Sequence, residues 1–277
     1  MSKSKISKAM IKEAWHSYLT TGDMPARMNP PWFERKAFRP LIKRLPHSPR
    51  CDICYIPFDG IGGWFSKSFW HVEPSKLNPR LCNLCERYAE EYNGGVELEI
   101  SILFVDVRGS TTMAEDLTTE EFRSKIDRFY RAATEVFYRN NGFVEKLLGD
   151  EVAGFFVPGF AGPKHAKVAL DTGRQIMKAM GYGRSSEPWI PVGMGINTGV
   201  AYVGSVNAGS GITDISMLGD AVNTTARLTS LAGAGEILIS EAARKAADLQ
   251  PDGMDARNLQ LKGKRKTVKA WALKMSA

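Results

Sequence analysis

The chain has 277 residues, of which 43% are hydrophobic and 24% charged, and its formal net charge is +7. This is the ordinary composition of a soluble globular protein. It contains no run of about 20 apolar residues that would span a membrane, and no apolar segment follows the basic N-terminus as in a secretory signal. We therefore expect a cytoplasmic protein without a transmembrane segment.

The positive charge is concentrated in the N-terminal third. Residues 1–95 hold 15 Lys and Arg against 9 Asp and Glu, whereas residues 96–277 hold 22 against 21. Such an excess can attract nucleic acid or an anionic surface. Because the basic residues are scattered along the segment, we interpret them as a solvated face and do not expect nucleic acid as a partner.

The first elements are helical. Apolar residues recur close to every 3.6 positions over residues 5–20, which predicts an amphipathic helix. A proline-containing stretch follows, and residues 33–45 predict a short basic helix. Residues 1–50 are accordingly interpreted as an N-terminal helical segment.

All four cysteines of the chain lie in two C-x-x-C pairs with 27 residues between them, Cys51, Cys54, Cys82 and Cys85. Two such pairs supply the four soft ligands of a structural zinc site. An iron–sulfur cluster uses the same ligands, and redox disulfides or free thiols are further alternatives. We predict a metal-binding module over residues 51–92, with a loop at 57–63 and a short helix at 86–92.

A strand, a helix and a hairpin begin the remainder of the chain. Apolar and polar residues alternate from Val96 to Ile102, which predicts a half-buried strand that ends at Asp106. Thr118 precedes two glutamates and a run of apolar residues at helical spacing, the pattern of an N-capped helix. Gly149 and the two acidic residues after it separate two apolar runs, the pattern of a β-hairpin.

The rest of the chain alternates further between helix and strand. We predict helices over 164–180 and 220–231, a long strand or hairpin over 192–206, and late strands near 237–239, 256–261 and 268–273. This alternation indicates an α/β sandwich built around one sheet.

Several polar side chains fit the chemistry of nucleotides. Asp106 and Asp150, 44 residues apart, provide carboxylates of the kind that Mg²⁺ prefers. Asn223 and Arg227 are four residues apart and share a helix face, and the arginine fork matches phosphate oxygens. Lys146 can donate a hydrogen bond to a ring nitrogen of a base. Together these groups suit the closure of a nucleoside triphosphate into a cyclic monophosphate.

The segments that carry these residues, together with Leu218–Val222, resemble the class III adenylate and guanylate cyclase family over residues 96–277. The resemblance implies a catalytic domain over this range, with a ferredoxin-like βαββαβ core. It implies that Asp106, Asp150 and the carbonyl of Val107 bind two Mg²⁺ or Mn²⁺ ions at each active site.

The resemblance also assigns the substrate contacts. Lys146 corresponds to the base-reading lysine of adenylate cyclases, and Ser216 stands where many animal-type members carry aspartate and a bacterial subgroup carries serine or threonine. Asn223 corresponds to the residue that orients the ribose and Arg227 to the one that stabilises charge on the phosphate. Further contacts are expected from the residues after the first strand and near the C-terminus, Gly109, Ser110, Thr111 and Lys264.

The resemblance implies a homodimer, because the family builds its active site between two cyclase domains. We expect an adenylate cyclase, a lyase that converts ATP to cyclic AMP and pyrophosphate in intracellular signalling. One alternative is a cyclase that uses GTP or a pyrimidine nucleotide. The other is a dimeric regulator without activity, whose cysteine module binds nucleic acid or protein. The sequence does not identify an upstream regulator.

Overall fold

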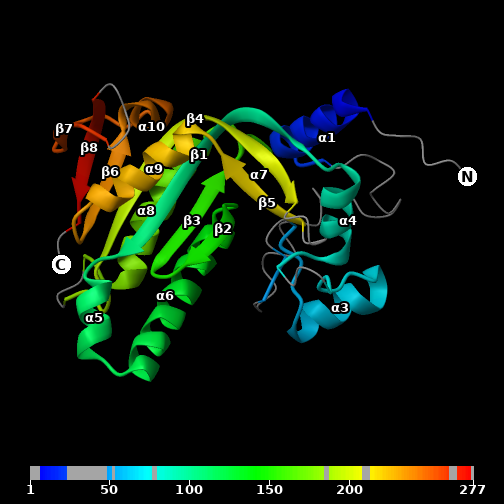
Figure 1. Ribbon diagram of the computed structural model, residues 1–277, viewed down its shortest axis with the longest axis horizontal. Coiled ribbons are helices and arrows are strands. Elements are labelled where there is room, and N and C mark those ends of the chain that lie inside the picture. The colour runs from blue at the N-terminus through cyan, green and yellow to red at the C-terminus, as the bar shows by residue number, and fades with distance from the viewer. Residues whose placement is uncertain are drawn as a thin grey trace, which may run out of the picture. The chain divides into compact units, whose positions relative to one another are not determined.

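A computed structural model of the protein (Figure 1) describes residues 7–23, 49–51, 54–76, 80–183, 187–207, 213–261 and 267–275. The chain divides into two compact units. The first comprises Met1–Leu98 and Tyr202–Met217, and the second comprises Glu99–Ala201 and Leu218–Ala277. The basic helix predicted over 33–45 lies outside the described residues. In the described part, no helix combines the length and the apolar character needed to cross a bilayer.

Helix α1 (Lys8–Thr21) confirms the first predicted helix and belongs to the first unit. Its N-terminus is capped by the Ser7 side chain, and it ends at Gly22, whose φ of 83° is readily adopted by glycine. The buried Trp15 indole donates a hydrogen bond to the carbonyl of Tyr92 over 2.7 Å. This bond and the surrounding aromatic packing fix α1 against the end of helix α4 (Asn83–Glu91).

The segment between the two cysteine pairs differs from the prediction. A loop was expected over residues 57–63, but in the structure helix α3 (Gly60–Trp70) begins at Gly60. The Asp59 side chain accepts a hydrogen bond from the amide of Gly60 and caps the helix. The prediction was wrong because glycine has low helix propensity, and here the cap and the packing of the glycines override it. Helix α4 confirms the short helix predicted before residue 93.

The elements of the large sheet follow in chain order. Three local predictions are confirmed: the strand that ends near Asp106, the capping box of Thr118 with Glu121, and the hairpin at Gly149. The remaining elements are β1 (Gly95–Val107), α5 (Ser110–Asp116), α6 (Thr119–Arg139), β2 (Phe143–Leu148), β3 (Glu151–Phe156), α7 (Pro158–Ala161), α8 (His165–Met180), β4 (Val192–Asn207), β5 (Thr213–Leu218), α9 (Asp220–Leu231), β6 (Glu236–Ser240), α10 (Glu241–Ala246), β7 (Asp255–Leu259) and β8 (Val268–Lys274).

The strands form one sheet in the order β2-β3-β1-β4-β6-β8-β7, with β5 paired to β4. The first four strands in chain order, with α6 and α8 between them, make a βαββαβ unit with the strand order β2-β3-β1-β4, which is the ferredoxin-like arrangement. The predicted fold class is therefore confirmed. Strand β6 joins β4 in parallel, after the crossover through α9, and extends the sheet.

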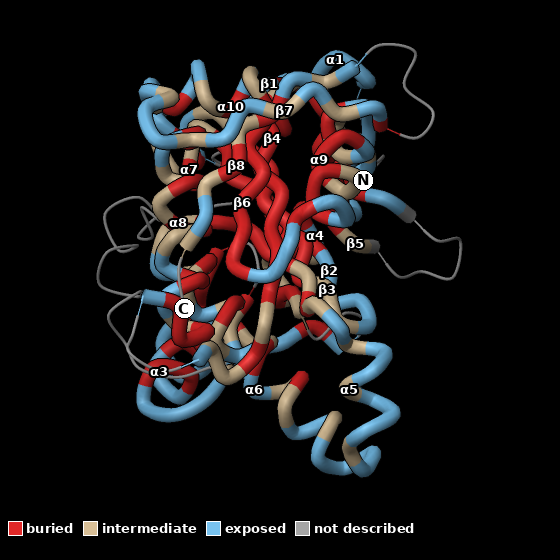
Figure 2. The backbone as a smooth tube through the Cα atoms, turned by 90° about the vertical axis from the view of Figure 1, so that its left-hand side faces the viewer, coloured by how far each residue is buried: buried red, intermediate tan, exposed pale blue. Residues whose placement is uncertain are grey.

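Helices cover both faces of the sheet in the second unit. Ile237 and Ile239 point into the large core that includes residues of α6, α8 and α10, whereas Leu238 between them packs against Leu228 of α9. This alternation is expected of a strand that is buried on both faces. Figure 2 shows the central strands as largely buried.

Helix α9 lies directly on strand β4 because that strand presents glycines to it. A Cβ atom at Gly195 would lie 2.5 Å from the hydroxyl of Thr229, and one at Gly193 would lie 2.8 Å from the carbonyl of Ala232. Both glycines therefore permit an approach that a larger residue would prevent. Gly193 and Gly195 thus set the distance between α9 and the sheet.

Candidate functional site

The two aspartates predicted as metal ligands lie at the same end of neighbouring strands. Strands β1 and β3 are antiparallel, with Asp106 opposite Glu151, and the amide of Val107 donates to the carbonyl of Asp150 over 3.1 Å. Asp150 occupies the two-residue turn between β2 and β3, where Gly149 adopts a φ of 62°. The ladder thus brings together two carboxylates from distant parts of the sequence, and both are partly exposed.

An arginine that the sequence analysis did not single out lies among these carboxylates. Arg108 forms an ion pair with the Asp106 carboxylate, and its amide donates to the carbonyl of Pro191 over 2.8 Å. Burial lowers the pKa of Arg108, and the negative charges of Asp150 and Glu151 oppose that shift. The guanidinium therefore offsets part of the negative charge of this acidic cluster.

Two further residues shape the cluster. Burial raises the pKa of Glu151, and the charge of Asp150 raises it further. The Tyr130 hydroxyl of α6 donates to the carbonyl of Gly149 over 2.6 Å and so holds the turn that carries Asp150. In the sequence, only the position of Glu151 next to Asp150 pointed to a role in the site. Nothing in the sequence pointed to such a role for Tyr130, because its helical spacing indicates only a core position.

We expect Arg108→Gln to bind Mg²⁺ about tenfold more tightly than the unaltered protein, because the ion no longer competes with an internal cation for Asp106. The metal-free variant should be less stable by about 1–2 kcal/mol, since its acidic cluster has lost its counter-charge. Thermal unfolding at increasing Mg²⁺ concentration measures both effects. Arg123→Gln is the matched control, because that arginine forms only surface ion pairs on α6. Unchanged or weaker Mg²⁺ binding in Arg108→Gln would contradict the competition.

The predicted ribose and phosphate residues project from helix α9. Asn223 is exposed and Arg227 is half-buried, one turn further along. Among the described residues, Arg227 makes no ion pair, and no hydrogen bond or ion pair joins either residue to Asp106 or Asp150. The carboxylates and the α9 residues are thus two separate groups of side chains in one chain.

The other predicted substrate residues are distributed over several elements. Lys146 is exposed on β2, next to a register shift in its pairing with β3, and Ser216 is buried on β5. Gly109, with a φ of 69°, precedes α5, and Ser110 and Thr111 are the first residues of that helix. Lys264 lies outside the described residues.

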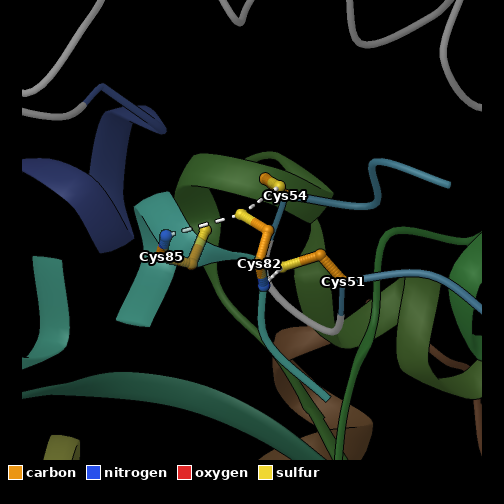
Figure 3. Close-up of side chains that lie close together, drawn as sticks. All are labelled: Cys51, Cys54, Cys82 and Cys85. Carbon is orange, nitrogen blue, oxygen red and sulfur yellow. Dashed lines mark hydrogen bonds between the residues drawn. The ribbon is translucent and has the colours of Figure 1, made fainter. Parts of the chain in front are cut away.

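The four cysteines form a single buried cluster (Figure 3). Their sulfur atoms all lie within 4.8 Å of one another, and the sulfurs of Cys54 and Cys82 are 3.6 Å apart. The amide of Cys82 donates to the sulfur of Cys51 over 3.3 Å, and the amide of Cys85 to that of Cys82 over 3.4 Å. Bonds of about 2.3 Å to one tetrahedral ion would place the sulfurs about 3.8 Å apart, so this donor set fits a metal.

Binding of a cation at the cluster is coupled to the release of protons. Burial raises the pKa of Cys51 and Cys82 well above the ordinary value for a thiol. Without a metal the thiols are therefore protonated, and a metal that binds there displaces their protons. The cluster joins the two ends of the segment that contains α3, because Cys54 precedes that helix and Cys82 caps α4.

Comparisons with known proteins agree with this fold. The model of the adenylate and guanylate cyclase catalytic domain matches residues 95–275. An adenylate cyclase of Anabaena cylindrica is 29% identical over 136 residues, which are 48% of this chain and 27% of that protein. Adenylate cyclase 1 of Rhizobium meliloti is 27% identical over 138 residues, 48% of this chain and 21% of its own length. The chain thus spans about a quarter of the length of these curated relatives.

Two solved structures are similar to this chain. The guanylyl cyclase Cya2 is 27% identical, with a TM-score of 0.59, and the match covers 65% of this chain and 93% of that one. The adenylyl cyclase CyaB from P. aeruginosa is also 27% identical, with a TM-score of 0.57, and the match covers 65% of this chain and 96% of that one. The residues matched by the family model, 95–275, include the strand ends that carry Asp106 and Asp150.

Proposed function

The chain belongs to the adenylate and guanylate cyclase family, and we propose that this nucleotide cyclase converts ATP to 3′,5′-cyclic AMP and pyrophosphate. The observation that carries the proposal is the pairing of β1 with β3, which brings Asp106 and Asp150 to one strand end. An enzyme that closes a triphosphate needs such a pair of carboxylates for divalent ions. The retained Asn223 and Arg227 on α9 supply the polar groups for the nucleotide.

Asp106 and Asp150, with the backbone carbonyl of Val107, are the residues that would hold two Mg²⁺ or Mn²⁺ ions. Such ions lower the pKa of a bound hydroxyl and neutralise phosphate oxygens. The pairing of β1 with β3 holds the backbone of both aspartates in place, so little reorganisation is needed on binding. In the absence of the ions, the ion pair of Arg108 with Asp106 offsets part of the negative charge of the carboxylates, and ions bound by Asp106 would have to compete with this ion pair.

The remaining residues bind and orient the nucleotide. Lys146 donates to a ring nitrogen of adenine, and the hydroxyl of Ser216 both donates and accepts at the base. Asn223 orients the ribose, while the guanidinium of Arg227 stabilises negative charge on the phosphate in the transition state. Gly109, Ser110 and Thr111 line the triphosphate, and Lys264 is assigned to its terminal phosphates.

The active site is shared between two copies of the chain. One copy supplies Asp106 and Asp150, and the other supplies the base, ribose and phosphate contacts. Support comes from large apolar side chains that are exposed on the monomer beside these residues in the sequence. Their exposed fractions are 46% for Leu147, 68% for Leu148, 61% for Val200, 53% for Leu218 and 49% for Leu231. Exposed apolar side chains that form one contiguous patch mark an interaction surface, and a patch of this kind would be covered in the dimer.

The cysteine cluster is proposed to hold one Zn²⁺ ion. The sulfurs are close enough to surround a single ion, whereas a cubane iron–sulfur cluster binds each thiolate through a different iron and so holds the sulfurs farther apart. The four thiols are buried, an environment that suits a structural ion without an open coordination position.

The nucleotide preference can be tested by product analysis with ATP, GTP, CTP and UTP, each with Mg²⁺ and with Mn²⁺. We expect cyclic AMP from ATP as the main product. Lys146→Ala should lower kcat/KM for ATP by about 10–100-fold and for GTP by less, since the lysine matches an acceptor of adenine. Lys167→Ala is the control, because that lysine forms a surface ion pair on α8.

The products of this test show separately whether the predicted base preference and the predicted cyclisation reaction are correct. A larger yield of cyclic GMP would retain the metal and arginine roles but would contradict the role of Lys146. Cyclic GMP is the specific alternative, because Ser216 lacks the carboxylate of many adenylate cyclases and the matched Cya2 is a guanylyl cyclase. The absence of any cyclic product from the intact dimer would contradict the proposed activity.

A further inference from the structure

The compact unit that contains the cysteine module, residues 51–92, also contains Tyr202–Met217, which is the end of β4 and most of β5. We call the described residues of this segment, 202–207 and 213–217, the β4–β5 arm. Ser216, which the proposed function places at the base of the nucleotide, is a buried residue of this arm. Contacts between the cysteine module and the arm can therefore act on a residue of the proposed nucleotide site.

An ion pair joins the cysteine module to β5. The guanidinium of Arg80 lies 3.6 Å from one carboxylate oxygen of Asp214, and the two side chains are 39% and 41% exposed. The other carboxylate oxygen of Asp214 accepts a hydrogen bond from the amide of Ile215 over 2.9 Å, which orients the group. Arg80 is two residues before Cys82, whose amide and sulfur both take part in the buried cysteine cluster. The position of Arg80 in the chain thus couples β5 to the cluster.

The ion pair acts on the face of β5 that carries Ser216. Successive side chains of a strand point to opposite faces, so Asp214 and Ser216 share a face and are separated by about 7 Å along the strand. Ile215 and Met217 point to the other face, and both are buried. A displacement of Asp214 would therefore move the Ser216 hydroxyl as well.

A second contact joins the end of the module to β4. The amide of Gly94 donates to the hydroxyl of the buried Ser205 over 2.8 Å, and the amide of Ser205 donates to the carbonyl of Gly94 over 2.8 Å. A Cβ atom at Gly204 would collide with the same carbonyl, so the backbones are in direct contact here. Gly94 follows shortly after α4, the helix that Cys82 caps. We call the contacts of Arg80 and Ser205 together the arm clamp.

We propose that the arm clamp positions Ser216 for the base of the nucleotide, so that the cysteine module sets the affinity of the enzyme for its substrate. The inference rests on the proposed function, in which Ser216 contacts the base. Arg80 and Ser205 are positioning residues that act through Ser216. The carboxylates Asp106 and Asp150 belong to the other compact unit. A change in the clamp should therefore alter KM more than kcat.

The test is a charge reversal across the ion pair in the full chain. Arg80→Glu and Asp214→Arg each place two like charges beside one another, and each should raise KM for ATP by about fivefold while kcat changes by less than about twofold. The double variant Arg80→Glu/Asp214→Arg regains opposite charges and should return KM to within about twofold of the wild-type value. Lys67→Glu is the matched control with unchanged KM, because Lys67 pairs with Glu73 inside the module.

Hydrogen exchange of the β5 amides measures the clamp without catalysis. Exchange should become faster in both single variants and return to the wild-type rate in the double variant. It should also become faster in Ser205→Ala, which leaves the amide of Gly94 without its hydroxyl partner. Metal analysis shows whether the cysteine cluster is intact in each variant. If Arg80→Glu loses its metal, Asp214→Arg and Ser205→Ala replace it, because both changes lie outside the cysteine module.

Failure of the clamp and failure of the proposed function give different results. A wild-type protein that forms no cyclic nucleotide would contradict the proposed function, and the exchange of β5 would still test the clamp. Unchanged exchange in the single variants would overturn the clamp. Faster exchange with an unchanged KM would overturn the positioning of Ser216, as would a raised KM that the double variant does not restore.

Discussion

The Asp106→Ala variant is expected to form cyclic AMP at least about 10³-fold more slowly than the wild-type enzyme, with Mg²⁺ and with Mn²⁺. The carboxylate lies at the end of β1, opposite Glu151, and no other side chain supplies its position. Arg227→Ala should lose activity to a similar extent, because the charge that develops on the phosphate is then unpaired. Steady-state rates at saturating ATP measure both losses.

A mixture of the two inactive variants should recover about a quarter of the wild-type activity. Random exchange makes half of the dimers mixed, and each mixed dimer has one site with an intact Asp106 from one copy and an intact Arg227 from the other. The recovery separates a shared site from a site within one chain, which would stay inactive in the mixture.

Asp127→Ala is the control for charge removal, because Asp127 lies on the exposed side of α6 and pairs with Arg123. It should retain wild-type activity. No recovery in a mixture with demonstrated subunit exchange would contradict the dimeric site, whereas full activity of Asp106→Ala would contradict the metal role itself.

Cys51→Ser is expected to remove the metal of the cysteine cluster and to unfold the segment around it. A structural zinc ion contributes about 10 kcal/mol or more to the folding free energy of a small module, which is as much as the whole free energy of unfolding of many domains. The second unit should stay folded, because it has its own large core around α6, α8 and the sheet. Hydrogen exchange should therefore become fast in α3 and α4 and remain slow in β3 and β6.

Metal analysis of the purified chain accompanies this experiment. One zinc per chain in the wild-type protein and none in Cys51→Ser supports a single structural ion. Ser68→Ala is the matched control, because Ser68 is an exposed residue of the same module. Detection of iron and inorganic sulfide in the wild-type protein would identify an iron–sulfur cluster in place of zinc. An unchanged metal content in Cys51→Ser would show that the four cysteines do not bind the metal.

The sequence predicted those parts of the fold in which local signals agree with the tertiary structure. Strand β1 alternates apolar and polar residues as its burial does, and the capping box of Thr118 starts α6 where the glutamates indicate it. The hairpin around Gly149 needs a positive φ, which glycine supplies. These elements carry Asp106 and Asp150, so the place of each aspartate in a strand or turn followed from local patterns, whereas their proximity depends on the pairing of β1 with β3.

Other features depend on contacts that a sequence does not reveal. The first turn of helix α3 was predicted as part of a loop over 57–63 because its glycines are poor helix formers, whereas in the structure Gly63 packs closely against the backbone of Phe58. The ion pair between Arg108 and Asp106 depends on the local chain geometry after β1 and on its contact with Pro191. Local propensity contains no information about either contact.

The contact of α9 with Gly195 has a consequence for how this enzyme tolerates genetic drift. Gly195 carries no side chain, yet a single methyl group there would push back the helix that carries Asn223 and Arg227. A natural variant at this site would therefore lower turnover by displacing these residues, and it would also lower the melting temperature, because overpacking costs about 1–3 kcal/mol. Selection on catalysis thus extends to a strand residue whose only contribution is the absence of a side chain.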